Sequence, residues 1–390
     1  MSDSQILHIA QDEKFISAAQ YLFEKAFPRQ NRFIIIKAAA DPPLRYIDDQ
    51  LDAEFIVRSQ STVSDLLAFS KKAKVVVFHG LNPLKGDMFL KSPEKQKFVG
   101  IIYGGEVYNS RISGDDFLGD KTRELDEKLK ETSIIDRIKD FLRWIKYYDM
   151  HHLYEDVKME DVFYRMNSFG FTSKSTYEGY IKRGIINPTS QMIPFSYYPL
   201  EYIIKDDTLR ATGPNILLGN SASATNNHLE AIDFLKKLEI KERQVVTPLS
   251  YGFDNYANVI ESYGYQQLSD NFVSVREFMP LEQYNKLISN CGFVVMNHYR
   301  SQAMGNLITS IYLGAKVFLN ETDAYKHFRD IGCYVYSISE DLVKNGKASL
   351  TPLTEDQVAH NRQILRDELS TQVLVNKLQQ SFKDFFMIKA

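Results

Sequence analysis

Short runs of hydrophobic residues alternate along the first half of the chain with segments that carry the 3.6-residue period of an amphipathic helix. We expect strands at 5–10, 31–39, 74–80 and 97–105, and helices at 15–27 and 62–73. A further strand and turn are expected at 162–170. Because the strands are apolar without alternation, each is expected to be buried on both faces. The pattern therefore predicts a parallel sheet with helices on both sides.

The same rhythm resumes after residue 214. Strands are predicted at 215–219, 243–249, 272–278, 292–298 and 316–320, with helices at 226–238, 256–264, 281–291 and 306–315. The intervening segment 188–214 holds four prolines and no clean period, which is typical of a hinge.

Length points the same way, because 390 residues are more than one compact core normally accommodates. We predict an α/β protein of two Rossmann-like domains that face each other across a cleft. The N-terminal domain is expected at 1–200 and the C-terminal domain at 201–370. The last segment, 371–390, is expected to form a helix that packs back on the N-terminal domain.

Composition excludes several classes of protein. The net charge of −3 gives no support to broad nucleic-acid binding. Cys291 and Cys333 are isolated in apolar surroundings, so they form neither a metal framework nor a disulfide scaffold. No apolar run near the N-terminus is long enough for a signal peptide, and none reaches the ~18 residues that cross a bilayer. We therefore expect a cytoplasmic protein, with the inner face of the inner membrane as a further location.

Ligands in open α/β sheets lie beyond the carboxyl ends of the strands, so the residues at those ends are the candidates for a site. In "ILLGNSASATNNHLEAI" (216–232) a strand ends at Gly219 and small polar residues lead into a helix. A glycine turn before a helix N-terminus is suited to binding a phosphate. The same pattern is also found in an ordinary βα loop with a good helix cap.

Several stretches resemble the Fuc4NAc transferases, the TDP-N-acetylfucosamine:lipid II N-acetylfucosaminyltransferases of glycosyltransferase family 56. They are "ILLGNSASATNNHLEAI", "YGFDNYANVIE" (251–261), "RSQAMGNLITSIYLGAKVFLN" (300–320), "VVVFHGLNP" (75–83) and "YGGEVYN" (103–109). Glu106 stands where that family tends to have Asp. The resemblance implies a GT-B architecture, a TDP- or UDP-linked deoxy-amino sugar as donor in the C-terminal domain, and a lipid-linked or glycan acceptor at the N-terminal domain. It also implies a place in bacterial surface-polysaccharide assembly.

Glycosyl transfer needs stabilisation of the leaving diphosphate and a positioned acceptor hydroxyl. The sequence contains no Asp-x-Asp motif, so we expect a metal-independent enzyme without a cofactor. Helix N-termini and Arg300 are the expected source of positive potential. The candidate donor-binding residues are Gly219, Asn220, Ser221, Asn226, His228, Tyr251, Gly252, Phe278, Met279, Arg300, Gln302, Gly305 and Asn306. For Arg300 a surface salt bridge is the alternative, and for Gln302 and Asn306 it is helix capping.

The candidate catalytic residues are Glu106, as general base, and His79. Glu106 could instead order its own loop by accepting backbone hydrogen bonds, and His79 could be a structural residue of the core. The candidate acceptor-binding residues are Gly80, Asn82 and Gly105.

A basic amphipathic helix predicted at 133–157 would suit an anionic membrane surface, although such helices more often cover a core. Two other functions remain open on the sequence alone, a nucleotide-sugar epimerase of the same architecture and a non-catalytic protein that binds sugar nucleotides.

Overall fold

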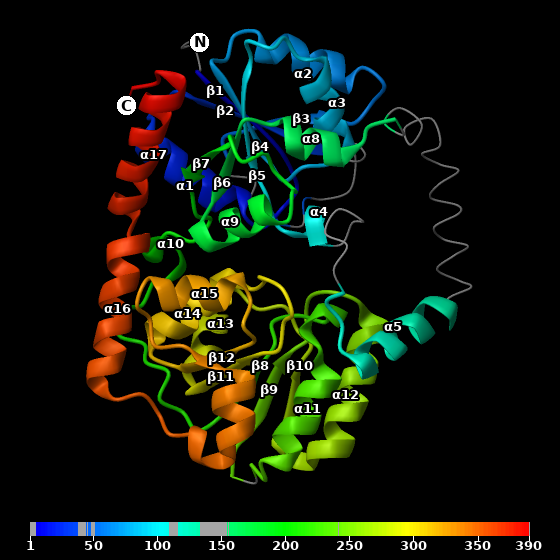
Figure 1. Ribbon diagram of the computed structural model, residues 1–390, viewed down its shortest axis with the longest axis vertical. Coiled ribbons are helices and arrows are strands. Elements are labelled where there is room, and N and C mark those ends of the chain that lie inside the picture. The colour runs from blue at the N-terminus through cyan, green and yellow to red at the C-terminus, as the bar shows by residue number, and fades with distance from the viewer. Residues whose placement is uncertain are drawn as a thin grey trace. The chain divides into compact units, whose positions relative to one another are not determined.

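The computed structural model describes residues 5–37, 44, 46–47, 51–108, 116–132, 154, 156–240 and 242–389 (Figure 1). Contacts between Cα atoms divide the chain into two compact units. The first unit comprises Met1–Asp115, Ile138–Pro199 and Leu369–Ala390, and the second comprises Asp116–Arg137 and Leu200–Glu368. Each unit has a parallel sheet of its own.

The sheet of the first unit has seven parallel strands in the order β3-β2-β1-β4-β5-β6-β7. The strands are β1 (Ile6–Gln11), β2 (Asn31–Lys37), β3 (Glu54–Val57), β4 (Val75–His79), β5 (Lys97–Ile101), β6 (Ser168–Phe171) and β7 (Gln191–Pro194). The helices of this unit are α1 (Ile16–Ala26), α2 (Thr62–Ser70), α3 (Pro83–Lys91), α4 (Gly105–Tyr108), α8 (Met159–Arg165), α9 (Lys174–Lys182) and α17 (Thr371–Phe386).

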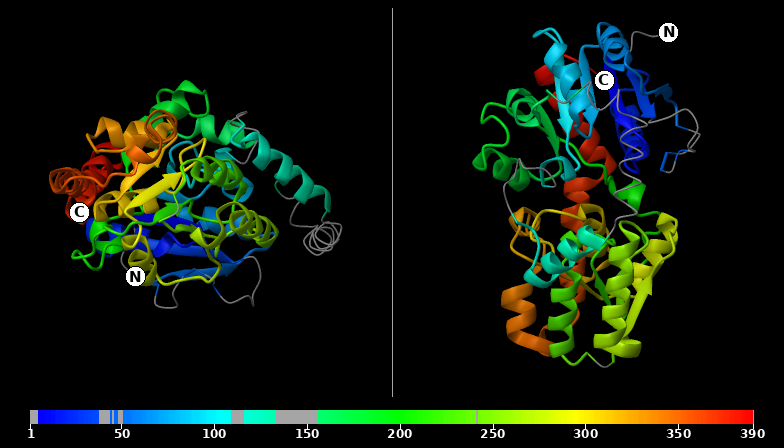
Figure 2. Two further views of the ribbon diagram at one scale, coloured as in Figure 1. Left: turned by 90° about the horizontal axis from the view of Figure 1, so that it is seen from below. Right: turned by 90° about the vertical axis from the view of Figure 1, so that its right-hand side faces the viewer.

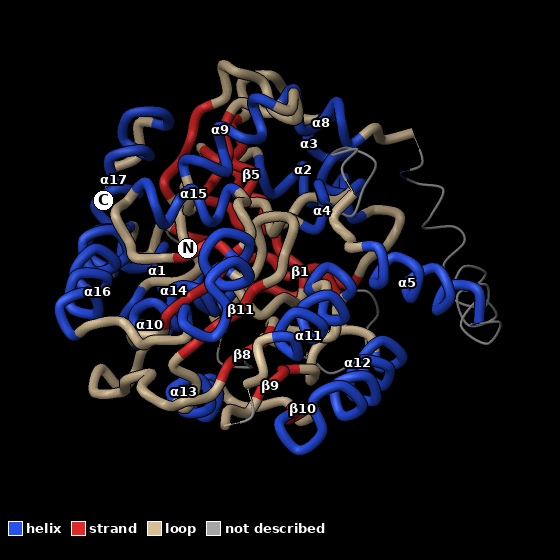
Figure 3. Tube along the Cα trace, turned by 60° about the horizontal axis from the view of Figure 1, so that its bottom comes forward, coloured by secondary structure: helices blue, strands red, loops and turns tan. Residues whose placement is uncertain are grey.

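The sheet of the second unit has six parallel strands in the order β10-β9-β8-β11-β12-β13, and Figure 3 shows β8 to β11 in red. The strands are β8 (Ile216–Leu218), β9 (Val245–Pro248), β10 (Phe272–Val275), β11 (Phe293–Met296), β12 (Lys316–Leu319) and β13 (Tyr336–Ser337). The helices are α5 (Asp120–Thr132), α10 (Leu200–Ile203), α11 (His228–Lys237), α12 (Asp254–Leu268), α13 (Leu281–Ser289), α14 (Met304–Leu313), α15 (Asp323–Asp330) and α16 (Glu355–Leu369).

The continuous apolar runs form the central strands as predicted, because every residue of β4, β8, β9 and β11 is buried. The predicted strand at 162–170 is partly wrong. Helix α8 extends to Arg165, and only Ser168–Phe171 pair in the sheet. Val162, Phe163 and Met166 are buried while Tyr164 is exposed, so the apolar residues follow a helical period that the short run concealed.

The region 188–214, predicted as a hinge, contains β7 and α10, and one boundary between the units falls within it, at Pro199 and Leu200. Most of the predicted amphipathic helix at 133–157 lies outside the described residues.

The C-terminal helix α17 packs against α1 within the first unit, as the red and blue ribbons show (Figure 1). The ring of Phe382 is buried, with its centroid 5.0 Å from that of Phe27 and 5.7 Å from that of Phe23. Gln379 Nε2 also donates to the carbonyl of Ala26 at 2.8 Å. The end of the chain is therefore part of the core formed by its beginning.

Helix α5 belongs to the second unit and lies beside α11 (Figure 2). Glu230 accepts from the amide of Thr122 at 2.9 Å and from its hydroxyl at 2.5 Å. Gly119 N donates to Asn227 Oδ1 at 2.8 Å. Residues 116–132 therefore belong to the second unit by their contacts, although they fall within the range 1–200 that was predicted as the N-terminal domain.

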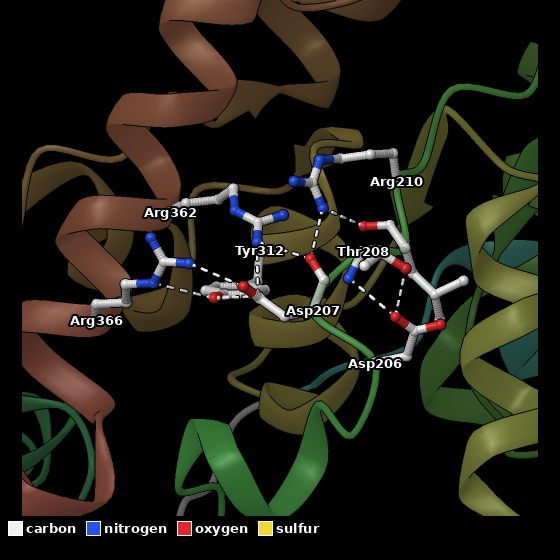
Figure 4. Close-up of polar contacts among 8 residues, drawn as sticks. Asp206, Asp207, Thr208, Arg210, Tyr312, Arg362 and Arg366 are labelled. Atoms are coloured by element: carbon white, nitrogen blue, oxygen red, sulfur yellow. Dashed lines mark hydrogen bonds and ion pairs between the residues drawn. The ribbon is translucent and has the colours of Figure 1, made fainter.

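A polar cluster around Asp207 joins the segment that follows α10 to α16 (Figure 4). Arg362 donates to Asp207 Oδ1 at 2.6 Å, Arg366 donates to Oδ2 at 3.1 Å, and Tyr312 O–H donates to Oδ1 at 2.6 Å. The guanidinium of Arg362 also lies 4.4 Å from the ring centroid of Tyr312. Asp207 follows the boundary between Pro199 and Leu200, and Arg366 precedes the boundary between Glu368 and Leu369. The cluster therefore joins the two ends of the segment Leu200–Glu368 within the second unit.

Within the described residues, no helix is both long enough and apolar enough to span a membrane.

We predict that Phe382→Ala lowers the free energy of unfolding by about 3–5 kcal/mol, because it removes a fully buried ring that the surrounding core cannot fully replace. Phe385→Ala is the matched control, since Phe385 lies on the same helix and is 40% exposed. Denaturant unfolding of both variants measures the difference. Equal losses for the two variants would contradict the packing of α17 described above.

Candidate functional site

The first unit's candidate site lies where its strand order reverses. β1 and β4 are neighbours, and the chain continues to β2 on one side and to β5 on the other. Parallel strands end at the same edge of a sheet, so Gln11 at the end of β1 and His79 at the end of β4 share that edge. Asn82 Nδ2 donates to Gln11 Oε1 at 3.0 Å, which connects the loops that follow the two strands.

Gly80 makes the sharp turn that follows β4. Its φ of +71° is favourable only for glycine, and an added Cβ would lie 2.6 Å from Tyr103 Cε2 and 3.2 Å from Glu106 Oε1. The absence of a side chain therefore lets the loop after β5 approach the loop after β4. This approach brings Glu106 to the predicted position at the strand ends.

Glu106 lies in the short helix α4, next to Gly105, and its carboxylate is held on one side only. Oε1 accepts hydrogen bonds from Leu81 N at 3.1 Å and Tyr103 N at 3.2 Å. Oε2 is buried and has no hydrogen-bond partner among the described residues. Burial raises the pKa of Glu106, and the backbone hydrogen bonds partly oppose the rise. One oxygen is thus oriented while the other is available to receive a proton.

His79 lies deeper, in a chain of buried hydrogen bonds. Asn31 Oδ1 is an acceptor, so His8 Nε2–H donates to it at 3.1 Å, and His8 Nδ1 accepts from His79 Nε2–H at 3.0 Å. His79 Nδ1 then accepts from the hydroxyl of Tyr197 at 2.9 Å. Burial holds the pKa of His8 at about 3 and that of His79 well below its usual value, which keeps both rings neutral. Because both ring nitrogens of His79 are engaged within the unit, the geometry favours Glu106 over His79 as a proton acceptor.

Asn82 is the N-cap of α3, where its Oδ1 accepts from Lys85 N at 3.1 Å. Two charged residues that the sequence reasoning missed lie in this region. Lys85 is buried, and its Nζ donates to the carbonyls of His79 and Gly80 at 2.5 and 2.8 Å. Glu13 follows β1, and burial raises its pKa. Their position just after strand ends was a signal available in the sequence.

In the second unit, Gly219 ends β8 with a φ of +68°. An added Cβ would lie 2.6 Å from His228 Nε2 and 2.7 Å from Asn226 Oδ1. Only glycine fits this position, for reasons of both backbone conformation and space. The loop that follows therefore folds back over the end of its own strand.

Asn226 is completely buried and braces this loop from inside. Its Oδ1 accepts from Asn220 N and His298 Nε2, both at 2.9 Å. Its Nδ2 donates to Ser221 Oγ and to the carbonyl of Ser223, both at 3.2 Å. The loop's own polar groups therefore use much of its hydrogen-bonding capacity, including the amide of Asn220.

Gln302 connects the loop after β8 to the loop after β11. It accepts from Thr225 Oγ1 at 2.8 Å, and its Nε2 donates to Asn220 Oδ1 at 3.3 Å. Asn227 and Asn297, which the sequence reasoning also missed, make a second connection. The side-chain amide of each donates to the other's carbonyl, at 3.1 and 3.0 Å. The structure thus brings the two predicted donor-binding loops together.

The other predicted residues occupy neighbouring strand ends. Tyr251 and Gly252 follow β9 and contact the first loop, since Ala222 N donates to the carbonyl of Tyr251 at 2.6 Å. Phe278, which is 75% exposed, and the partly buried Met279 follow β10. They follow the edge strand of the sheet, one strand further from β8 than β9 is.

His228, Arg300 and the start of α14 complete the set. His228 is buried and neutral, with Nδ1 3.2 Å from the hydroxyl of Tyr256 and with Nε2 unpartnered among the described residues. The charge of Arg300, which follows β11, helps burial to lower the pKa of His298 to about 3. Gly305 and Asn306 form the first turn of α14, where Asn306 Nδ2 donates to the hydroxyl of Tyr284 at 3.0 Å.

Ser301, beside Arg300, was not predicted from the sequence. Its hydroxyl oxygen is buried and has no hydrogen-bond partner in the part of the chain that the structure describes. A cation, a hydroxyl and a ten-residue helix N-terminus therefore follow one another at residues 300–304. This combination favours an anion. Among the described residues, no cluster of three or more His, Cys, Asp or Glu side chains is placed to hold a metal ion.

Comparison with known proteins identifies a matching family and several similar folds. A family model described as "4-alpha-L-fucosyltransferase glycosyl transferase group 56" matches residues 142–387. A glycosyltransferase from Rickettsia africae ESF-5 superposes with a TM-score of 0.63 at 12% identity, and each chain is covered completely. Anabaena Alr3699/HepE in complex with UDP and glucose gives a TM-score of 0.62 at 10% identity, with 97% of this chain and 99% of that chain covered.

A third similar structure is sucrose-phosphate synthase from Thermosynechococcus elongatus, with a TM-score of 0.56 at 11% identity and 98% of each chain covered. At these identities the structural likenesses speak for the fold. They confirm the predicted α/β architecture of GT-B type with two parallel-sheet units.

We predict that Gly219→Ala destabilises the second unit by about 1–3 kcal/mol, because the new Cβ meets both an unfavourable φ and two buried polar atoms. Gly346→Ala is the matched control. Gly346 has a φ of +60° in the same unit, but nothing lies within 4 Å of an added Cβ. Thermal and denaturant unfolding give the loss in free energy of unfolding for each variant. The difference between the two losses is the cost of the steric clash at Gly219, since both variants carry the cost of a positive φ. Equal destabilisation would show that the loop around Gly219 is not closely packed.

Proposed function

The chain belongs to the 4-alpha-L-fucosyltransferase family, glycosyl transferase group 56, and on that premise we propose how this glycosyltransferase binds its donor and activates its acceptor. The donor is a nucleoside diphosphate sugar held by the second unit, and the acceptor hydroxyl is activated by Glu106 in the first unit. The observation that carries the proposal is the carboxylate of Glu106: two amides orient one oxygen, and the other is buried with no hydrogen-bond partner among the described residues.

The diphosphate is placed at the N-terminus of α14, with Arg300 and Ser301 as its side-chain ligands. Three features support this placement: the helix dipole, the charge of Arg300 and the buried hydroxyl of Ser301, which has no hydrogen-bond partner within the described part of the chain. The amides of Asn220 and Ala222 already donate within the second unit. We therefore assign the Gly219–His228 loop mainly to shaping the site, through Gln302. The complexes of HepE with UDP and with UDP-glucose support a nucleotide-sugar donor.

The remaining predicted donor-binding residues fit around this core. Tyr251 and Gly252 are proposed to line the sugar site, because they contact the Gly219–His228 loop. Phe278 and Met279 are proposed to contact the nucleobase, because an exposed aromatic ring at a strand end offers a stacking surface. Gly305 and Asn306 contribute the first turn of α14.

In the proposed reaction the acceptor oxygen forms a bond to the anomeric carbon while the bond from that carbon to the phosphate oxygen breaks. The electron pair of the broken bond leaves with the diphosphate, whose charge Arg300 and the helix N-terminus offset. The proton of the acceptor hydroxyl passes to Glu106 Oε2. Gly80, Asn82 and Gly105 shape the acceptor side.

We further propose that the donor is a TDP- or UDP-linked deoxy-amino sugar and that the acceptor is a lipid-linked sugar or a glycan. The reaction would then belong to bacterial surface-polysaccharide assembly, at the inner face of the inner membrane, with peripheral membrane contact. These finer assignments rest on the sequence resemblance to the Fuc4NAc transferases.

We expect one of TDP, UDP, GDP and CMP to raise the melting temperature of the wild-type protein, because a ligand that binds only the folded state stabilises it by about 2.7 kcal/mol at 100 times its Kd. Arg300→Ala should reduce the shift strongly, and EDTA should leave it unchanged. Arg329→Ala, in an exposed position on α15, is the control. If no nucleotide shifts the melting temperature, or if both variants respond like wild type, the proposed donor site is wrong.

We predict that Glu106→Gln lowers the rate of sugar transfer about 10²–10⁴-fold while the nucleotide-induced thermal shift is retained. Because burial raises the pKa of Glu106, wild-type activity should fall as the pH drops through that raised value. Transfer is measured with a polyprenyl-diphosphate-linked sugar and with a soluble oligosaccharide as separate acceptors. Glu94→Gln, at an exposed position, is the control.

The same assay separates the other functions. Conversion of the donor sugar without any acceptor would indicate an epimerase. Donor binding without turnover, unaffected by Glu106→Gln, would indicate a non-catalytic binding protein.

A further inference from the structure

Lys85 is a charged residue in the interior of the first unit, with 1% of its surface exposed. It lies near the start of α3, and among the described residues no carboxylate forms an ion pair with it. Its ammonium instead donates to two backbone carbonyls, those of His79 and Gly80. A buried ammonium is costly to desolvate, so its position calls for an explanation beyond packing.

Several ionisable groups act on Lys85. Burial lowers its pKa to about 7, and the charges of Glu106 and Glu13 oppose that change. His79 also interacts with it electrostatically but stays neutral. Lys14 in turn acts on Glu13. Lys85 is therefore protonated below about pH 7, where it provides a buried positive charge opposite two carboxylates.

The two carbonyls that Lys85 holds belong to the turn at Gly80. The next amide of that turn, Leu81 N, is one of the two that orient Glu106 Oε1. Gly80 N donates to the carbonyl of Ile101 at 2.8 Å, which fixes the turn against β5. Lys85 and Glu106 thus bind the same turn: Lys85 donates to its carbonyls, and Glu106 accepts from its amide.

We propose that Lys85 is a positioning residue for Glu106: it fixes the turn at His79–Leu81, whose amide orients the carboxylate, and supplies a buried positive charge that favours the ionised carboxylate. This inference rests on the proposed role of Glu106 and extends it. Loss of Lys85 weakens two influences that lower the pKa of Glu106, the hydrogen bond from Leu81 and the charge of the ammonium. Its removal therefore shifts the protonation of Glu106 to higher pH.

The test compares Lys85→Met, Lys85→Arg and the control Lys91→Met, measuring kcat and donor KM across the pH range. Lys91 lies at the exposed end of the same helix, with 60% of its side chain accessible. Lys85→Met is expected to lower kcat about 10–100-fold with little change in donor KM, because a small displacement of a reacting group is costly. Its acid limb should move upward by about half a pH unit or more, since an opposite charge has been removed.

Lys85→Arg keeps the charge and should hold the acid limb near the wild-type position. Lys91→Met should behave as wild type. An unchanged acid limb in Lys85→Met, or a kcat loss that only follows the loss of folded protein in thermal melts, would overturn the proposal. If Lys85→Met does not fold, the more polar Lys85→Gln replaces it and the same outcomes apply.

A second readout does not depend on turnover. Carbon-13 NMR of glutamate-labelled protein identifies the Glu106 carboxyl as the signal that Glu106→Gln removes, and its titration gives the pKa directly. The pKa should be higher in Lys85→Met than in wild type and close to wild type in Lys85→Arg. If Glu106→Gln retains full activity, the proposed base is wrong, and the titration still decides whether Lys85 controls the carboxylate. If the titration of Glu106 is the same in all three proteins, the positioning role is wrong.

Discussion

The structure depends on one constraint: a parallel sheet covered by helices on both faces has apolar faces, so polar side chains that can bind a ligand lie in the loops beyond the strand ends. In both units the strands run in one direction, and the central ones are entirely buried. Backbone groups within such strands are consumed by the ladder, and the side chains above and below pack into apolar layers. Chemistry is therefore confined to the loops at the carboxyl ends. Both parts of the proposed glycosyltransferase site lie there.

Two glycines allow the loops beyond these strand ends to pack closely against their neighbours. Gly80 and Gly219 adopt positive φ at the ends of β4 and β8, and a Cβ at either position would meet atoms within 2.6 Å. The missing side chain is what admits Tyr103 and Glu106 in the first unit, and Asn226 and His228 in the second. Buried hydrogen bonds nearby, such as the chain from Tyr197 to Asn31 and the contacts of Asn226, then give each loop a defined conformation.

The buried polar side chains at the strand ends have different roles in the two units. At the carboxyl-end loops of the second unit, Asn226 meets the hydrogen-bonding needs of its own loop, while Arg300 and Ser301 precede the N-terminus of α14, where we propose that an anion binds. At the carboxyl-end loops of the first unit, Glu106 and Lys85 are both buried, and the described residues form no direct ion pair with either of them. Isolated buried charges of this kind cost stability unless they are stabilised locally, and here backbone amides and carbonyls provide that stabilisation.

Hydrophobic periodicity alone determined the architecture, because continuous apolar runs between amphipathic segments fit only parallel sheets covered by helices. It also placed Glu106, Gly219 and Arg300 just after strands. It failed where the apolar spacing was ambiguous, as at Val162–Arg165, which was predicted to be part of a strand but belongs to helix α8. Tertiary structure alone decided which polar residues face one another. The hydrogen bond between Asn226 and His298, the buried hydrogen bonds of His79 and those of Lys85 to the turn at Gly80 connect residues on different elements. Their spacing along the chain contains no signal of these contacts, because each depends on how neighbouring strands bring their loops together.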